Sequence, residues 1–233
     1  MPPRPVGPGR EKPAVDRPVT LSGPERAPAS AEAPDSLVIF LHGYGSNGDD
    51  LIALAEPFAR VLPRAHFLSP HAIEPCPGAP QGYQWFPLST LSREERDEGV
   101  AKAGPVVAAY VEAQLARFAL APERCVLVGF SQGTMLALHV ALRFRPQLAG
   151  VLGYSGALAR IGMLMDEIRA RPPVQLVHGD QDPVVPAWVM FEALGALEAL
   201  RVPVNWHVSR NTPHAIAPDG LEVGARFLQR VLG

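Results

Sequence analysis

Short runs of apolar and β-branched residues recur along the chain. Six of them stand out: SLVIFLHG, AHFLSP, RCVLVGFS, LAGVLGYSG, PVQLVHG and VPVNWHVS. Five are apolar at nearly every position, as strands of a parallel sheet are when helices cover both faces. In the sixth, apolar and polar residues alternate from Val204 to Ser209, which indicates a strand nearer the sheet edge.

Helical patterns fill the stretches between these runs. The predicted helices cover residues 51–61, 94–120, 134–144, 187–200 and 221–232. The second contains Gly104-Pro105, where a kink is expected because proline lacks a backbone donor. The third is apolar almost all round, so we expect it to be buried. Alternating strands and helices predict an α/β fold with a mostly parallel central sheet and helices on both faces.

The N-terminus differs in composition from the rest of the chain. Residues 1 to about 18 are rich in proline and charge and are predicted to form a disordered arm. The remaining residues, 19–233, suit one domain with a well-buried core, since 47% of the whole chain is hydrophobic and 19% is charged. The loop from Pro70 to Thr90 shows no period, and structureless loops of that length usually carry function.

Charge and cysteine usage exclude several classes of protein. The formal net charge is -2, so no basic field predicts binding to nucleic acid or to an anionic membrane. Cys76 and Cys125 are far apart and are expected to be free thiols in the cytoplasm. No apolar run is long enough for a membrane span, and no signal peptide is recognised. No cofactor is expected, and no group of histidines and carboxylates has metal-site spacing.

The segment LVGFSQGTMLAL places a serine in the sharp turn between a predicted strand and a predicted helix. It contains G-x-S-x-G in the context that a nucleophilic serine requires. We expect glycine at positions 129 and 133 because a side chain at either would clash in the crowded turn. Ser131 is then held in a strained conformation with its hydroxyl exposed, next to a helix N-terminus that favours negative charge. The pattern predicts Ser131 as a catalytic nucleophile rather than a bystander in a tight turn.

A serine nucleophile needs a base, and the base needs an orienting acid. Two carboxylates follow the strand PVQLVHG. Asp180 comes directly after the Gly179 turn and is suited to capping that loop through backbone amides. Asp182 precedes Pro183, where the chain stays extended and leads toward the next helix. We favour Asp182 over Asp180 as the orienting acid.

Two late histidines compete for the role of base. His207 lies within the alternating strand, so its ring is committed to one face of the sheet. His214 lies in a loop after the last strand, and ligands of open parallel sheets bind outside the carboxyl ends of the strands. We therefore predict His214 as the general base.

Gly43, Gly45 and Gly48 have the G-x-G-x-x-G spacing of a dinucleotide-binding turn. Such a site also needs an acidic residue about twenty positions later, but that segment, AHFLSPHA, contains none. It needs a free helix N-terminus as well, and Asp49 and Asp50 stand there, where they would repel a phosphate. An oxidoreductase is therefore disfavoured.

The same loop suits an oxyanion. Acyl transfer through Ser131 creates an oxyanion that needs backbone N–H donors. Gln132, the residue after the nucleophile, is predicted to supply one. Tyr44, in the loop LHGYG after an earlier strand, is predicted to supply the second.

Five motifs together resemble the phospholipase/carboxylesterase family of α/β hydrolases: LHGYGSNGDDL, GFSQGTMLAL, GYSGAL, HGDQDPVVP and TPHAI. The family includes acyl-protein thioesterases and small bacterial esterases, and the resemblance covers roughly residues 19–233. It implies the α/β-hydrolase fold and a triad of Ser131, Asp182 and His214. It also implies Tyr44 and Gln132 as oxyanion donors. The family is often dimeric, so a homodimer is a further expectation.

The pocket and the substrate are less constrained. The stretch QWFPL, with Trp85 and Phe86, matches a family segment near the acyl pocket. Candidate walls are therefore Trp85, Phe86, Met135, Leu136 and Met163, although plain core packing explains each equally well.

The expected substrates follow from departures within the resemblance. Ser46 and Asn47 stand where the thioesterase branch usually has an acidic residue, and the loop EPCPGAPQG resembles bacterial carboxylesterases. We expect a serine esterase acting on small carboxylic esters through an acyl-enzyme. An acyl thioesterase or lysophospholipase with the same triad is the alternative, and a binding protein that lost its chemistry is a further one.

Overall fold

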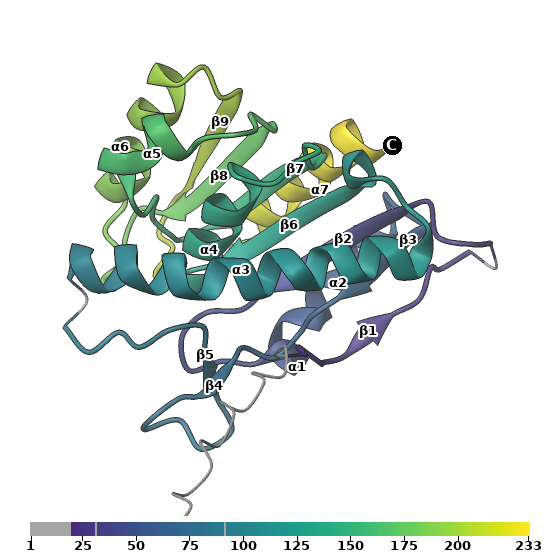
Figure 1. Cartoon of the computed structure of the whole chain (residues 1–233), viewed down its shortest axis with the longest axis horizontal. Coiled ribbons are helices and arrows are strands. Elements are labelled where there is room, and N and C mark those ends of the chain that lie inside the picture. The colour runs from purple at the N-terminus through teal and green to yellow at the C-terminus, as the bar shows by residue number, and fades with distance from the viewer. Residues whose placement is uncertain (1–19, 31, 91) are drawn as a thin grey trace, which may run out of the picture.

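The computed structural model describes residues 20–30, 32–90 and 92–233 (Figure 1). The arm predicted over residues 1–18 lies outside these residues. A seven-stranded sheet forms the centre, in the order β1-β3-β2-β6-β7-β8-β9, and only the β1–β3 pair is antiparallel. The strands are β1 (Glu25–Arg26), β2 (Ser36–Leu41), β3 (Ala65–Leu68), β6 (Cys125–Phe130), β7 (Gly150–Tyr154), β8 (Val174–Gly179) and β9 (Val204–Ser209).

Each of the six apolar runs forms a strand, so the predicted mostly parallel sheet is confirmed. The strands β2, β7 and β8 are buried along their whole length because helices cover both faces. β9 lies at the sheet edge and has exposed positions, as its alternating sequence predicted. The loop from Pro70 to Thr90 is not structureless, because β4 (Glu74–Pro75) and β5 (Tyr83–Gln84) form a small antiparallel hairpin within it.

Successive residues of each strand point to opposite faces, so the core has two halves. Leu37, Ile39 and Leu41 of β2 belong to one half, whereas Val38 and Phe40 belong to the other. The first half is completed by α3 (Arg93–Phe118), α4 (Gln132–Ala141), α5 (Ile161–Glu167) and α6 (Trp188–Ala199). The second is completed by α2 (Ala55–Ala59) and α7 (Pro218–Leu232), which lie behind the sheet in Figure 1.

Most helices are where the pattern predicted them, with two differences. The helix expected over residues 51–61 is divided into α1 (Gly48–Leu51), the 3₁₀ turn η1 (Ile52–Leu54) and α2. The division is expected because Pro57 cannot donate a helical hydrogen bond and its ring crowds the carbonyl four residues earlier. The second difference is α5, which was not predicted. The helix predicted over 94–120 is α3, one continuous helix that contains Pro105.

α4 is buried at every residue, as its uniformly apolar sequence predicted. A further 3₁₀ turn, η2 (Pro122–Arg124), leads into β6. No helix in the described part of the chain is both long and apolar enough to cross a bilayer. Among the same residues, no group of His, Cys, Asp and Glu side chains is arranged to hold a metal ion.

Candidate active site

The turn between β6 and α4 holds Ser131 in a conformation that side chains rarely adopt. Its φ is 53° and its ψ is −114°, and its N–H donates to the Tyr154 carbonyl of β7 at 2.9 Å. A Cβ added to Gly133 would lie 1.8 Å from the Leu41 carbonyl oxygen, and one on Gly129 would lie 2.4 Å from the Thr134 nitrogen. The predicted strain at Ser131 and the predicted crowding at both glycines are therefore confirmed.

Two backbone segments pass beside Ser131. Gln132 is the first residue of α4, where N–H groups have no acceptor within the helix. The loop after β2 comes equally close, because a Cβ on Gly43 would lie 3.4 Å from the Ser131 Cβ. Tyr44, the next residue, lines the same cavity as Ser131. The two predicted oxyanion donors thus belong to segments on either side of the serine.

The carboxylate of Asp182 accepts a hydrogen bond from His214. Its Oδ2 lies 2.7 Å from His214 Nδ1, and its Oδ1 accepts the N–H groups of Val184 at 2.9 Å and Val185 at 2.8 Å. Burial acts to raise the pKa of Asp182, but the bonds from His214 and the two amides outweigh burial and leave that pKa below its usual value. An ionised carboxylate therefore fixes the orientation of the His214 ring at neutral pH.

A second histidine supports this carboxylate. His178 is buried, and its Nε2 donates to the Val185 carbonyl at 2.7 Å while lying 3.3 Å from Asp182 Oδ2. Burial lowers the pKa of His178, so the ring stays neutral near pH 7. His178, the next-to-last residue of β8, therefore contacts the candidate acid directly.

The other candidate acid and base are engaged elsewhere. Asp180 Oδ1 accepts the N–H of Thr212 at 3.2 Å and so holds the loop that carries His214. This is the loop-capping contact expected of Asp180. His207 pairs with Asp219 of α7 at 2.8 Å. The structure brings Asp182, and not Asp180, to His214.

His42 was not among the predicted residues; it directly follows β2 and is fully buried. His42 Nε2 accepts the N–H of Ala72 at 3.0 Å, so Nδ1 carries the proton and donates to the Gly43 carbonyl at 2.8 Å. Burial lowers the pKa of His42 to about 4, although the bond to Gly43 acts in the opposite direction. A neutral ring therefore holds the loop in place. The only sequence feature that could have indicated this role of His42 is its position at the end of an apolar strand.

The structure favours the core alternative for Trp85 and Phe86. Both are buried in the core, and neither borders the cavity that contains Ser131. The Trp85 indole donates to the His42 carbonyl at 2.9 Å, and the Phe86 ring packs against Gly99 of α3. The Gln132 side chain joins both residues to α4, since it accepts the Trp85 N–H at 2.9 Å and donates to the Phe86 carbonyl at 2.7 Å. The QWFPL segment therefore packs against His42 and Gln132, the residues next to the site.

A cavity of about 620 Å³, here called the active-site cavity, is bordered by both Ser131 and His214. Met135 lines it as predicted, whereas Leu136 and Met163 do not. The His214 ring also packs against Phe130, the residue before the serine, with ring centroids 4.9 Å apart. Ser131 and His214, both described residues, share no hydrogen bond here, and such bonds often form only when substrate is present.

Comparisons with known proteins identify the family of the chain. The profile of the phospholipase/carboxylesterase family matches residues 25–232. The crystal structure of esterase PE8 is 41% identical, covers 92% of this chain and 100% of its own, and superposes with a TM-score of 0.89. Acyl-protein thioesterase 1 of Gibberella zeae is 27% identical over 220 residues, which is 87% of this chain and 93% of that protein. Esterase YpfH of Escherichia coli is 28% identical over 174 residues, 72% of each chain.

The family match covers residues 25–232. The sheet, the serine turn and the pair of Asp182 and His214 are consistent with it. On these grounds the chain belongs to the phospholipase/carboxylesterase family of α/β hydrolases and is a carboxylic ester hydrolase.

Proposed function

We propose that the protein is a serine esterase that cleaves carboxylic esters through an acyl-enzyme on Ser131. The observation that carries the proposal is that His214 borders the same cavity as Ser131 and is hydrogen bonded to the buried Asp182. A serine in a strained turn, an imidazole and an orienting carboxylate are the three parts that nucleophilic catalysis by serine requires.

In the first half of the reaction, Ser131 Oγ attacks the ester carbonyl carbon. The serine proton passes to His214 Nε2, and Asp182 stabilises the resulting imidazolium through the bond to Nδ1. The carbonyl oxygen becomes an oxyanion that accepts the N–H groups of Gln132 and Tyr44. The bond to the alcohol then breaks, the alcohol oxygen takes the proton from His214, and the acyl group stays on Ser131.

In the second half, water replaces the alcohol. It gives one proton to His214 and attacks the acyl carbon, and a second oxyanion forms at the same donors. The bond to Ser131 Oγ breaks, the serine recovers the proton from His214, and the carboxylic acid leaves. Each proton that His214 accepts is returned within the same half-reaction.

The lining of the active-site cavity favours substrates with an apolar acyl group. Apolar side chains make up much of the lining, among them Leu88, Met135, Leu158, Val185 and Val189. An ion pair of 2.7 Å between Arg93 and Glu192 adds charge to the same wall. We favour small carboxylic esters as substrates, with thioesters as a second candidate because one relative is an acyl-protein thioesterase.

The proposal is tested by hydrolysis of nitrophenyl esters from acetyl to long acyl chains, with wild type, Ser131→Ala and Ser155→Ala. Ser155 is a matched control because it too has a positive φ, 46°, at the end of a neighbouring strand, and its hydroxyl has no partner among the described residues. We expect Ser131→Ala to lose at least about 10⁴-fold in kcat/KM, and Ser155→Ala to stay within a few-fold of wild type. Equal rates for wild type and Ser131→Ala would overturn the proposal.

Substrate class is tested separately with pairs of esters and thioesters that share one acyl group. Short-chain esters should be hydrolysed fastest if the small-ester assignment is correct. A kcat/KM that is higher for the thioester of each pair, and that rises with chain length, would instead favour the thioesterase assignment.

A further inference from the structure

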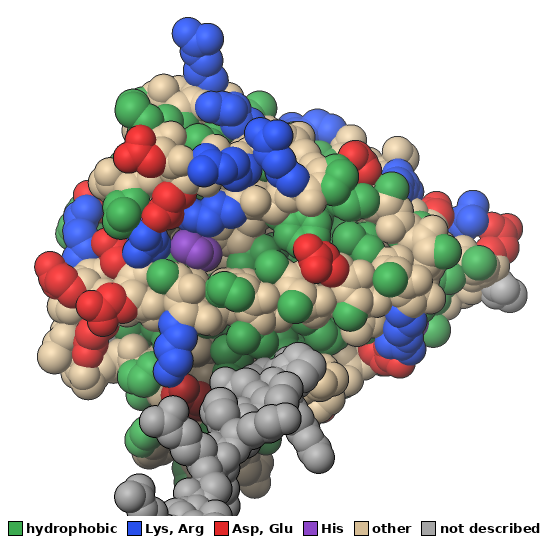
Figure 2. All heavy atoms as spheres, viewed as in Figure 1, with side chains coloured by type: hydrophobic (Ala, Val, Ile, Leu, Met, Phe, Trp, Pro, Cys, Tyr) green, Lys and Arg blue, Asp and Glu red, His purple; other side chains and the backbone are tan. Residues whose placement is uncertain are grey.

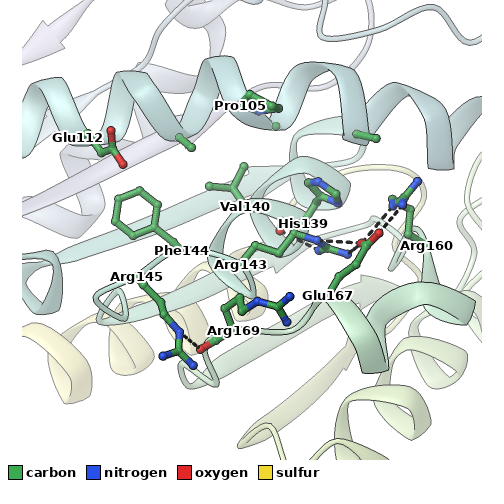
Figure 3. A pocket seen from close by; sticks show the side chains of 13 residues that line it. Pro105, Glu112, His139, Val140, Arg143, Phe144, Arg145, Arg160, Glu167 and Arg169 are labelled. Atoms are coloured by element: carbon green, nitrogen blue, oxygen red, sulfur yellow. Dashed lines mark hydrogen bonds and ion pairs between the residues drawn. The ribbon is translucent and has the colours of Figure 1, made fainter.

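A second cavity, here called the arginine cavity, lies between α3, α4 and α5 and has a volume of about 640 Å³. Figure 3 shows α3 along one side and the arginines opposite it. On the face drawn in Figure 2, basic side chains gather next to a hollow with an apolar floor. The proposed chemistry at Ser131 uses none of this surface.

Four arginines and two glutamates border the arginine cavity: Arg143, Arg145, Arg160, Arg169, Glu112 and Glu167. Glu167 lies between Arg143 and Arg160 and accepts hydrogen bonds from both. These bonds, the one from Arg160 foremost, lower the pKa of Glu167 to about 2, so it stays ionised. One carboxylate thus already occupies a fork of guanidinium groups in this wall.

The other two arginines are exposed and have no carboxylate partner among the described residues. Arg145 Nε donates to the Arg169 carbonyl at 2.6 Å, and Arg169 Nη1 donates to the Asp166 carbonyl at 2.7 Å. These contacts fix both side chains without neutralising them. Guanidinium groups held in this way are suited to carboxylate or phosphate oxygens.

His139 adds an unmet hydrogen-bonding group to the same wall. Its side chain is 7% exposed, and Nδ1 has no partner among the described residues. The ring packs against Gly104 of α3, since a Cβ there would lie 2.7 Å from its Cδ2. Buried polar atoms normally find a partner, so this wall is not fully satisfied by the described residues themselves. Burial, together with the charges of Arg143 and Arg160, lowers the pKa of His139 to about 3 and keeps it neutral.

The remainder of the lining is apolar. Val140 and Phe144 are buried at the base, and Pro105 and Ala108 of α3 form the facing wall (Figure 3). Apolar carbon next to unneutralised guanidinium groups is complementary to a molecule with an apolar body and an anionic head.

We propose that the arginine cavity is a second ligand site that binds an amphipathic anion, with a carboxylate or phosphate head on Arg145 and Arg169 and an apolar body on Val140 and Phe144. It is distinct from the site of the reaction, although Arg160 borders both cavities. The Arg160 backbone N–H is bonded to Asp97 at 2.5 Å, and Asp97 lines the active-site cavity.

Calorimetric titration of the full chain with four eight-carbon probes tests the proposal: octanoate, octyl phosphate, octan-1-ol and octyltrimethylammonium. We expect saturable one-to-one binding of at least one anion, and weaker binding of the alcohol and the cation. The ratio of the two anion affinities identifies the preferred head group. Failure of both anions to bind, or equal binding of octan-1-ol, would overturn the proposal.

Variants distinguish this cavity from the active-site cavity, which could also hold a carboxylate. Arg145→Gln with Arg169→Gln should weaken anion binding at least about tenfold, because charge-assisted hydrogen bonds are lost. Arg226→Gln with Arg230→Gln removes the same charge from α7, behind the sheet, and should change affinity less than about twofold.

A second pair of variants blocks space instead of removing charge. Ala108→Trp fills the cavity, whereas Ala109→Trp places the same side chain on an exposed position of α3 that does not line it. We expect only Ala108→Trp to abolish binding. Unchanged affinity in both cavity variants would assign the anion to another site and refute the proposal.

Discussion

The active-site cavity and the arginine cavity are nearly equal in volume, about 620 and 640 Å³, and both border α3, α4 and Arg160. A histidine lines each cavity and has a carboxylate nearby, Asp182 for His214 and Glu167 for His139. They differ in what those groups contact. Asp182 is hydrogen bonded to His214, whereas Glu167 is bonded to two arginines and His139 Nδ1 has no partner among the described residues. Residue types and space alone therefore do not make a reactive site.

The physical difference lies in which groups can exchange protons. An arginine stays protonated at all working pH values, so the Glu167 cluster can hold charge but cannot move a proton. A histidine ring oriented by a buried carboxylate can accept a proton and return it. The first arrangement suits binding, and the second suits catalysis.

The largest effect is expected when the pair of Asp182 and His214 is disrupted, because the proposed reaction depends on it. Asp182→Asn removes the charge that stabilises the His214 imidazolium, so we expect kcat for ester hydrolysis to fall about 10⁴-fold. Asp180→Asn is the matched control, because the Asp180 side chain accepts the loop amide of Thr212 and not His214, and its loss should cost less than about tenfold. Equal losses in the two variants would remove the distinction between these carboxylates.

The second prediction concerns the buried histidine of the arginine cavity. The pKa of His139 is about 3 in the folded protein and about 6.5 when unfolded, so between these values the unfolded chain binds more protons. The free energy of unfolding should therefore fall as the pH drops from 6.5 toward 3, by about 1.4 kcal/mol per pH unit from this residue. Urea titrations at several pH values should show a shallower dependence for His139→Leu than for wild type.

His42 should contribute in the same direction, since its pKa of about 4 is lowered from an ordinary 6.5. The charged groups that act on His139 are Arg143, Arg160 and Glu167, and none of them titrates between pH 4 and 6.5. An identical pH dependence in wild type and His139→Leu would show that His139 is protonated as readily in the folded state as in the unfolded one.

The smallest expected effect is the loss in the free energy of unfolding when one ion pair of each cavity is broken. Glu167→Gln leaves the partly buried Arg143 without its counter-charge, so we expect a loss of about 1–3 kcal/mol in the free energy of unfolding. Glu192→Gln breaks the exposed pair with Arg93 and should cost about 0–1 kcal/mol. Urea denaturation measures both, and a larger loss for Glu192→Gln would contradict this ranking of the two clusters.

Local sequence predicted much of the fold because the relevant signals are local. Every apolar run became a strand, and the G-x-S-x-G turn has the strain that its glycines implied. The small β4–β5 hairpin and α5 were missed because neither shows a strong period of its own. The helix expected over 51–61 is divided, and Pro57 is a local sequence feature that explains the division.

The site could be predicted only as far as single residues indicate their chemistry. A serine in that turn and a histidine in a loop after the last strand are readable from the sequence. Trp85 and Phe86 were misplaced because two large apolar side chains suit a pocket wall and a core equally well, and the packing against His42 and Gly99 decides between them.

The sequence by itself therefore determined the order of strands and helices, the strained serine turn and the small set of polar residues near the strand ends. Only the tertiary structure decided which carboxylate meets His214, which residues wall each cavity, and that a histidine is held buried beside four arginines. The reason is that periodicity and turn chemistry act between neighbours in the chain. The contacts of Asp182 with His214 and of Arg143 with Glu167 join residues 32 and 24 positions apart, and they depend on how the whole chain packs.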